Sequence, residues 1–233
     1  MITSSTALYW VIFIGIAALS WLVSSRLKSK FEKYSQVPLP GGLTGREVAE
    51  RMLRQNGIED VQVTSVAGHL TDHYDPTKKT VNLSESVYAS NSIAAAAVAA
   101  HECGHAVQHA CAYAPLKLRS RLVPIVSFSS NIVQWVLLAG MLLIKTFPQL
   151  MLIGIVMFAL TTLFSFITLP VEIDASRRAL AWLKTSGLTS RETDSMARDA
   201  LQSAAYTYVV AALGSLATLL YYILIFTSGS RRD

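Results

Sequence analysis

The chain has 233 residues, which is room for one or two domains, and it carries a formal net charge of +5 at pH 7. Hydrophobic residues make up 52% of it and charged residues only 15%, a balance too apolar for an ordinary soluble protein. Because no basic motif is interleaved with aromatic residues, the positive charge argues against nucleic-acid binding and indicates membrane topology and contact with anionic lipid.

Four apolar segments are predicted to cross a membrane. They are Ala7–Val23, Leu122–Ile144, Leu150–Leu169 and Tyr206–Phe226. Most reach the ~20 residues that a hydrocarbon core about 30 Å thick requires, and the first is at the short end. The first segment has no basic stretch before it and no small-residue cleavage site after it, so we expect a retained anchor rather than a signal peptide. The pattern predicts a multi-pass protein of the lipid bilayer.

The basic residues give these segments an orientation. Of the 20 Lys and Arg residues, twelve lie between the first and second segments and five between the third and fourth. Basic residues favour the cytoplasmic side, so we expect both loops in the cytoplasm of a cell with this chain in its inner (plasma) membrane. The predicted division is an N-terminal transmembrane anchor (1–25), a cytoplasmic domain (26–120), a transmembrane hairpin (121–170), a second cytoplasmic segment (171–205) and a C-terminal transmembrane helix (206–233).

The first loop begins with a short helix and a small sheet. Thr44, followed three residues later by Glu47, predicts a capping box, and the helix that it opens should end at Asn56-Gly57. Val61–Thr64 alternates as a strand does. Two segments flank a turn-like tetrapeptide and are predicted to form a hairpin, namely His69–Asp75 and Lys79–Leu83. The second of these is either an ordinary hairpin strand or an exposed edge strand able to hold an extended peptide, and we take it as the candidate edge.

An alanine-rich helix follows over Ala94–Gln108, capped by Ser90-Asn91-Ser92, and it carries the string His101-Glu102-Cys103-Gly104-His105. Residues four apart lie on the same face of a helix, so His101 and His105 can hold one zinc ion. Glu102 can reach a water at that ion and act as general base. The alternative is two ordinary helix histidines beside a surface carboxylate.

A zinc site of this kind needs a third protein ligand. His109 continues the histidine stripe, but it lies about 12 Å along the axis from His101, too far for one tetrahedral ion. The candidate is Glu172, and its rival is Asp174. Pro170 predicts a helix boundary, which would put Glu172 in the first turn of a new helix. Two residues apart on a helix lie on nearly opposite faces, so only one of the two carboxylates can face the zinc.

Three segments resemble the putative neutral zinc metallopeptidase family of bacterial membrane proteins, and the resemblance extends over nearly the whole chain. The segments are Asp72–Leu83, Ala99–Gln108 and Leu169–Ala179. That family is similar to the membrane proteases that include HtpX and the prenyl-protein endopeptidase. The resemblance implies zinc (Zn2+) ligands at His101, His105 and Glu172, with Glu102 as general base. The wider group carries E-x-x-A-D where this chain ends in Ser176, so a neutral hydroxyl stands where a carboxylate would orient a ligand histidine.

These observations predict a mainly α integral membrane protein, with four transmembrane helices and a zincin-like cytoplasmic domain that contains a small β-sheet. The predicted activity is that of a zinc metalloendopeptidase that cleaves membrane proteins or peptides at the cytoplasmic face. The alternative is a zinc-stabilised membrane scaffold that regulates a larger membrane complex without cleaving anything. An intact Glu102 favours the enzyme, because a purely structural zinc site has no use for that base.

Overall fold

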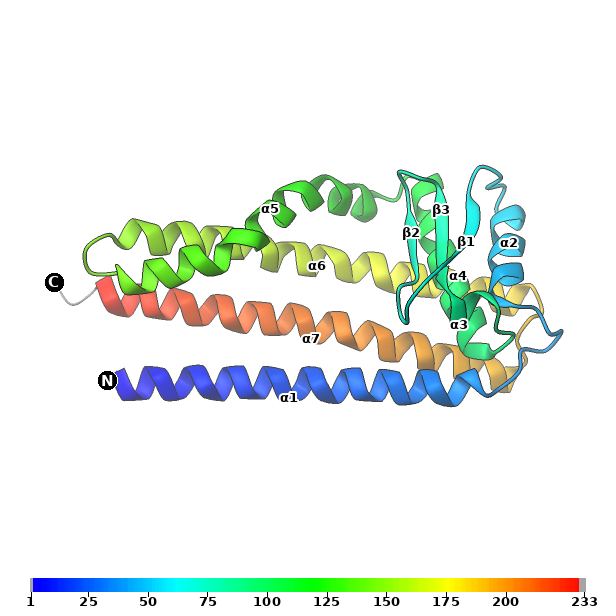
Figure 1. Ribbon diagram of the computed structural model, residues 1–233, viewed down its shortest axis with the longest axis horizontal. Helices are drawn as coiled ribbons and strands as arrows, with labels where there is room; N and C mark the ends of the chain where they lie inside the picture. Colours follow the sequence, from blue (N-terminus) through cyan, green and yellow to red (C-terminus); the bar gives the residue numbers. More distant parts are fainter. Residues whose placement is uncertain (1, 231–233) are drawn as a thin grey trace. The chain divides into compact units, whose positions relative to one another are not determined.

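The computed structural model describes residues 2–230, and its contacts divide the chain into two units. The apolar-helix unit comprises residues 2–22, 118–169 and 207–230. The α/β unit comprises Val23–Lys117 and Pro170–Tyr206. Four helices have residues in both units, namely α1 (Ile2–Ser35), α5 (Ala114–Leu142), α6 (Pro148–Thr185) and α7 (Arg191–Ser230) (Figure 1).

The apolar-helix unit consists of parts of α1, α5, α6 and α7. Within the described residues, four helices are long and apolar enough to cross a membrane, which agrees with the four predicted spans. Only 0% to 22% of each apolar window is buried by the rest of the chain, so most of this surface is left to lipid. Trp21 and Trp135, for example, are more than two-thirds exposed, at 73% and 71%.

The prediction that Pro170 begins a new helix is wrong, because α6 runs unbroken from Pro148 to Thr185 with Pro170 inside it. Proline removes one hydrogen bond, the one that its missing N–H would give to the carbonyl of Phe166. A long helix with intact turns on both sides tolerates that single loss, as α5 also does at Pro124. Glu172 therefore lies inside a continuous helix rather than in a first turn.

The α/β unit starts with α2 (Gly45–Gln55), where the predicted capping box is present. The Thr44 side chain accepts from the backbone N–H of Glu47, and the Glu47 carboxylate accepts from the backbone N–H of Thr44 at 2.8 Å. The helix ends at Asn56, followed by Gly57 with φ +69°, a left-handed conformation that glycine adopts without strain. The later elements are α3 (Glu85–Tyr88) and α4 (Ile93–Ala110), and the Ser92 side chain caps α4 by accepting from the Ala95 N–H.

The sheet has three strands, β1 (Gln62–Val66), β2 (His73–Asp75) and β3 (Thr80–Ser84), in the order β1-β3-β2. β2 and β3 form the predicted antiparallel hairpin, and β1 pairs with β3 in parallel. The prediction of Lys79–Leu83 as an edge strand is therefore wrong, since β3 lies in the centre. The reason is that β3 pairs with β1 on one side as well as with β2 on the other, so neither side of β3 is free. The pairing with β1 joins residues far apart in the sequence, and the pattern of neighbouring residues does not reveal it. The edges are β1 and β2.

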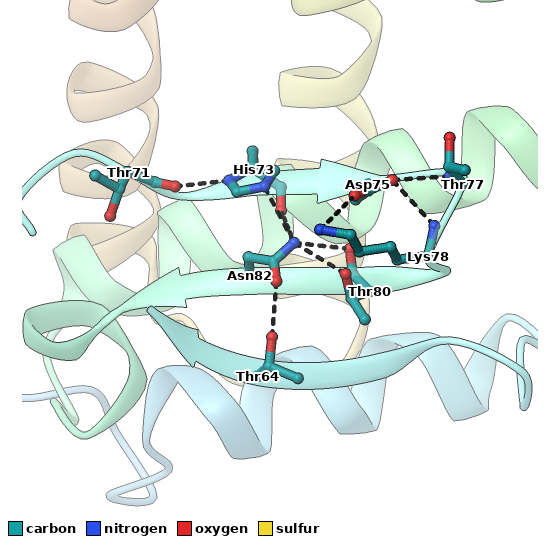
Figure 2. A network of polar contacts seen from close by, with 8 residues as sticks. All are labelled: Thr64, Thr71, His73, Asp75, Thr77, Lys78, Thr80 and Asn82. Atoms are coloured by element: carbon teal, nitrogen blue, oxygen red, sulfur yellow. Dashed lines mark hydrogen bonds and ion pairs between the residues drawn. The ribbon is translucent and has the colours of Figure 1, made fainter. Parts of the chain in front are cut away.

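A ladder of polar side chains crosses the three strands (Figure 2). Thr64 in β1 donates to the Asn82 carbonyl oxygen in β3 at 2.8 Å, and the Asn82 amide nitrogen lies 3.2 Å from His73 Nε2 in β2. His73 Nδ1 lies 2.8 Å from the Thr71 carbonyl. Both ring nitrogens of His73 are thus engaged within the sheet, which places this histidine in the hairpin rather than at a metal site.

The hydrophobic core of the α/β unit lies between α2, the sheet and α4, with the ends of α6 and α7 adding to it. Its fully buried members include Met52 from α2, Leu83 from β3 and Leu183 from α6. The alanines of α4 are buried almost without exception, and such small side chains let neighbouring helices approach closely. The core therefore holds α4 rigidly against the part of α6 that carries Glu172.

Candidate metal centre

Two helices of the α/β unit supply the side chains that could hold a metal ion. His101 and His105 lie one turn apart on α4, and Glu172 comes from α6. The helices approach closely at Gly104, where an added Cβ would lie 2.6 Å from the Ala175 carbonyl oxygen. A side chain at this position would push the helices apart, so glycine is required between the two histidines for α6 to come this near.

The spacing of the three side chains fits a tetrahedral zinc ion. Glu172 Oε2 lies 3.3 Å from His101 Nε2 and 3.5 Å from His105 Nε2. Two ligand atoms each about 2.0–2.1 Å from a tetrahedral ion are separated by about 3.3–3.4 Å. Charge-assisted N–H···O hydrogen bonds are shorter, at about 2.7–2.9 Å, so these distances match ligand-to-ligand edges better than an ion pair. The ligand atoms of all three residues lie within 4.8 Å of one another.

The chemistry of the donor set also fits zinc. Two imidazoles and one carboxylate are a combination found at catalytic zinc sites, which keep a fourth position open. Glu172 is only 3% exposed and His105 9%, so these two side chains are largely desolvated. Glu102 is also buried, at 8% exposure, and within residues 2–230 its carboxylate makes no hydrogen bond or ion pair. Its oxygens are not among the buried side-chain atoms that lack a partner in the described residues, so the carboxylate keeps contact with solvent and is free to reach a water.

The rival carboxylate, Asp174, does not face the histidines. It accepts a hydrogen bond from Arg178 Nε at 2.6 Å and another from the Gln108 amide nitrogen at 2.9 Å. His109 also stands apart from the three ligands, since its Nδ1 lies 2.8 Å from the Tyr74 hydroxyl on β2. The structure thus brings together His101, His105 and Glu172, and it gives Asp174 and His109 other partners.

Each ligand histidine has a polar partner at its second ring nitrogen. His101 Nδ1 lies 3.1 Å from the Ser176 hydroxyl, and His105 Nδ1 lies 3.1 Å from the Gln108 amide oxygen. Such partners fix the orientation of a ligand ring. Ser176 is predicted from the sequence, whereas Gln108 is not. A detectable signal was present, because Gln108 is a polar residue one turn after His105 in a helix whose other inward positions are mostly alanine.

Two side chains of α4, His105 and Cys103, have pKa values that the protein raises for different reasons. Burial lowers the pKa of His105, but the hydrogen bond to Glu172 and the charges of Glu102 and Glu172 outweigh it, so this pKa lies above its ordinary value. A proton therefore competes with a metal ion for His105, and metal binding must weaken in acid. Burial raises the pKa of the Cys103 thiol well above its ordinary value. Cys103 thus stays a neutral packing residue, although it lies inside the motif.

Comparisons with known proteins identify the family of the chain. A family model described as "Putative neutral zinc metallopeptidase" matches residues 9–227. The chain belongs to this family. Within the zinc metallopeptidase family it is similar to the "Putative membrane protease YugP" of Bacillus subtilis (strain 168), with 46% identity over 220 residues that cover 94% of this chain and 97% of that protein. No solved structure gave a significant match.

Proposed function

We propose that the chain is a zinc-dependent membrane endopeptidase that cleaves membrane-associated proteins or peptides at the cytoplasmic face of the membrane. The observation that carries this proposal is the cluster of His101, His105 and Glu172 with its zinc-like spacing, next to the unpartnered carboxylate of Glu102. A purely structural zinc site has no use for a carboxylate that is free to act as a base.

The residues divide the chemistry between them. A zinc ion held by His101, His105 and Glu172 would polarise the scissile carbonyl and increase the acidity of an attacking water. Glu102 takes a proton from that water as it attacks the peptide carbonyl, and it returns the proton to the nitrogen that leaves when the C–N bond breaks. The same carboxylate therefore acts first as base and then as acid, which requires that no fixed partner occupy it.

The expected substrates follow from where the ligands lie along the chain. Glu172 comes three residues after Leu169, the end of the third predicted span. A peptide bond reaching this site would thus lie close to the bilayer surface, within about 10 Å. Of the two edge strands, β2 contacts α4, so β2 replaces the wrongly predicted β3 as the edge for an extended peptide. The cytoplasmic orientation rests on the basic residues of the two loops, 17 of the 20 in the chain.

The deciding experiment compares Glu102→Gln with His101→Ala in the full-length protein. Both variants and the parent are reconstituted in liposomes with membrane-tethered peptides, and new amino termini are counted by mass spectrometry. Glu102→Gln keeps the shape of the side chain but removes the base, which typically costs 10²–10⁴-fold in rate. It should retain zinc and lose cleavage, whereas His101→Ala should lose both. Glu85→Gln, the same change at an exposed position, is the matched control and should behave as the parent.

Either of two outcomes would end the peptidase proposal. If Glu102→Gln cleaves as the parent does with zinc confirmed bound, Glu102 is not the base. If neither the parent nor Glu102→Gln cleaves, and only His101→Ala has a cellular phenotype, the site is that of a zinc-stabilised scaffold. A soluble protein such as casein is a poor choice of substrate here, because a site so near the bilayer favours chains that are tethered to it.

A further inference from the structure

Gln108 is completely buried and forms hydrogen bonds at both ends of its amide. Its oxygen faces His105 Nδ1 at 3.1 Å on its own helix, α4. Its nitrogen donates to two oxygens of α6, the Val171 carbonyl at 2.8 Å and the Asp174 carboxylate at 2.9 Å. The side chain thus links His105 Nδ1 to the second helix of the site, and the zinc mechanism itself does not explain this link.

The partners of this amide decide which way it points. An amide can be turned end for end without changing its shape, so only its neighbours fix its orientation. Val171 offers a carbonyl oxygen, which can only accept. Asp174 is paired with Arg178 Nε at 2.6 Å, which keeps its carboxylate ionised and therefore also an acceptor. The amide nitrogen must face these two oxygens, and the amide oxygen must then face His105.

We propose that Gln108, held by Asp174 and Val171, is a positioning residue that fixes the ring of His105 with its proton on Nδ1 and its lone pair on Nε2. An amide oxygen can only accept, so the His105 nitrogen that faces it has to carry hydrogen. The bare Nε2 is the atom that lies 3.5 Å from Glu172 Oε2, on the side where a metal ion would bind. This inference rests on the metal role of His105 in the proposed function. It also gives a role to Asp174, the rejected ligand, which holds the Gln108 side chain in place behind His105.

The other ligand histidine is held differently. The Ser176 hydroxyl, 3.1 Å from His101 Nδ1, can donate or accept by rotating its hydrogen. It is therefore compatible with either tautomer of His101 and imposes neither. Of the two histidines, His105 is thus prepared for the metal by the fold, whereas His101 takes its ligand form when the metal arrives. Loss of the partner should accordingly cost more at Gln108 than at Ser176.

The tautomer can be measured directly in a metal-free chain. Glu172→Ala removes the metal site and also the carboxylate that competes for a proton at Nε2, so the ring of His105 then reports its Nδ1 partner alone. The full-length variant is labelled with 15N-histidine, and each of the five histidines is assigned by replacing it. Nitrogen chemical shifts, recorded at a pH where the rings are neutral, distinguish a protonated nitrogen from a bare one. We expect hydrogen on Nδ1 of His105 and a mixture after adding Gln108→Met. Hydrogen on Nε2 in Glu172→Ala alone would overturn the proposal, and this result does not depend on whether Gln108→Met folds.

Zinc affinity in the Glu172-containing chain is the second measurement. Losing the partner of a ligand histidine typically weakens metal binding 10–100-fold, so Gln108→Met should lose this much in competition with a chelator. Gln55→Met is the matched control, because Gln55 also bridges to α6, through Trp182 Nε1 at 2.8 Å, but touches no histidine. Parental affinity in Gln108→Met, or an equal loss in Gln55→Met, would contradict a positioning role. A parent that binds zinc but cleaves nothing would instead contradict the proposed function and leave this inference standing.

Discussion

Gly104→Ala should weaken zinc binding at a modest cost in stability. The added Cβ would lie 2.6 Å from the Ala175 carbonyl oxygen and 3.1 Å from its carbon, both of them backbone atoms that cannot turn aside. Reaching an ordinary contact of 3.4 Å requires α4 and α6 to separate by roughly 0.8 Å. Overpacking of this kind costs about 1–3 kcal/mol, and the better helix propensity of alanine returns about 0.8–1.0 kcal/mol. The net loss of stability should be about 0–2 kcal/mol.

The metal site tolerates such a shift much less well. His105 directly follows Gly104, and Glu172 lies three residues, about one turn, before Ala175. The distance of 3.5 Å between His105 Nε2 and Glu172 Oε2 therefore increases when the helices separate. Zinc sites hold their ligand distances to about 0.2 Å, which is well below the expected displacement. We expect zinc affinity to fall about tenfold or more, measured by chelator competition beside thermal unfolding of the metal-free protein.

Two other glycine variants separate metal loss from general damage. Gly140→Ala places a Cβ 2.6 Å from Met151 Cα in the apolar-helix unit, so it should lose stability and keep zinc. Gly15→Ala meets nothing within 4 Å and should change neither. The reasoning would be refuted if Gly104→Ala bound zinc as tightly as the parent, or if its zinc loss merely followed a loss of stability that Gly140→Ala reproduces.

Three further predictions concern the metal and the membrane. The parent should bind about one zinc per chain, Glu172→Ala should bind none, and Asp174→Ala should still bind it with lower affinity, so equal loss in both variants, by metal analysis, would contradict the ligand assignment. Ser176→Asp should tighten zinc binding about 10–100-fold in chelator competition, because a carboxylate would then hold the His101 ring, and weaker binding would show that Ser176 only fills space. The exposed thiol of Cys111 should resist an impermeant maleimide in intact cells and react after permeabilisation. In a Cys111→Ser chain, a cysteine introduced by Thr3→Cys should react in intact cells. The reverse pattern would place the site on the other side of the membrane.

Features set by neighbouring residues could be predicted from the sequence. The capping box at Thr44, the hairpin turn around Asp75 and the face shared by His101 and His105 each depend on a few residues within one or two turns of the chain. The position of β3 could not be predicted in this way, since it depends on β1 pairing with it from 18 residues away. The helix boundary predicted at Pro170 is wrong because the intact turns of α6 on both sides outweigh one missing hydrogen bond.

The choice between Glu172 and Asp174 shows how local spacing and long-range packing combine. At about 100° per residue, the two carboxylates point roughly 200° apart on α6, so one helix face holds Glu172 and Ser176 and another holds Asp174 and Arg178. The first pair has the same four-residue spacing as His101 and His105, and the two turns face each other with Glu172 at the metal-binding nitrogens and Ser176 at the far nitrogen of His101. The helical periodicity of the sequence shows that only one of these two faces of α6 can contribute a metal ligand. Which face it is follows from the packing of α4 on α6, and the same packing turns the rejected carboxylate towards Gln108 and so towards the back of His105.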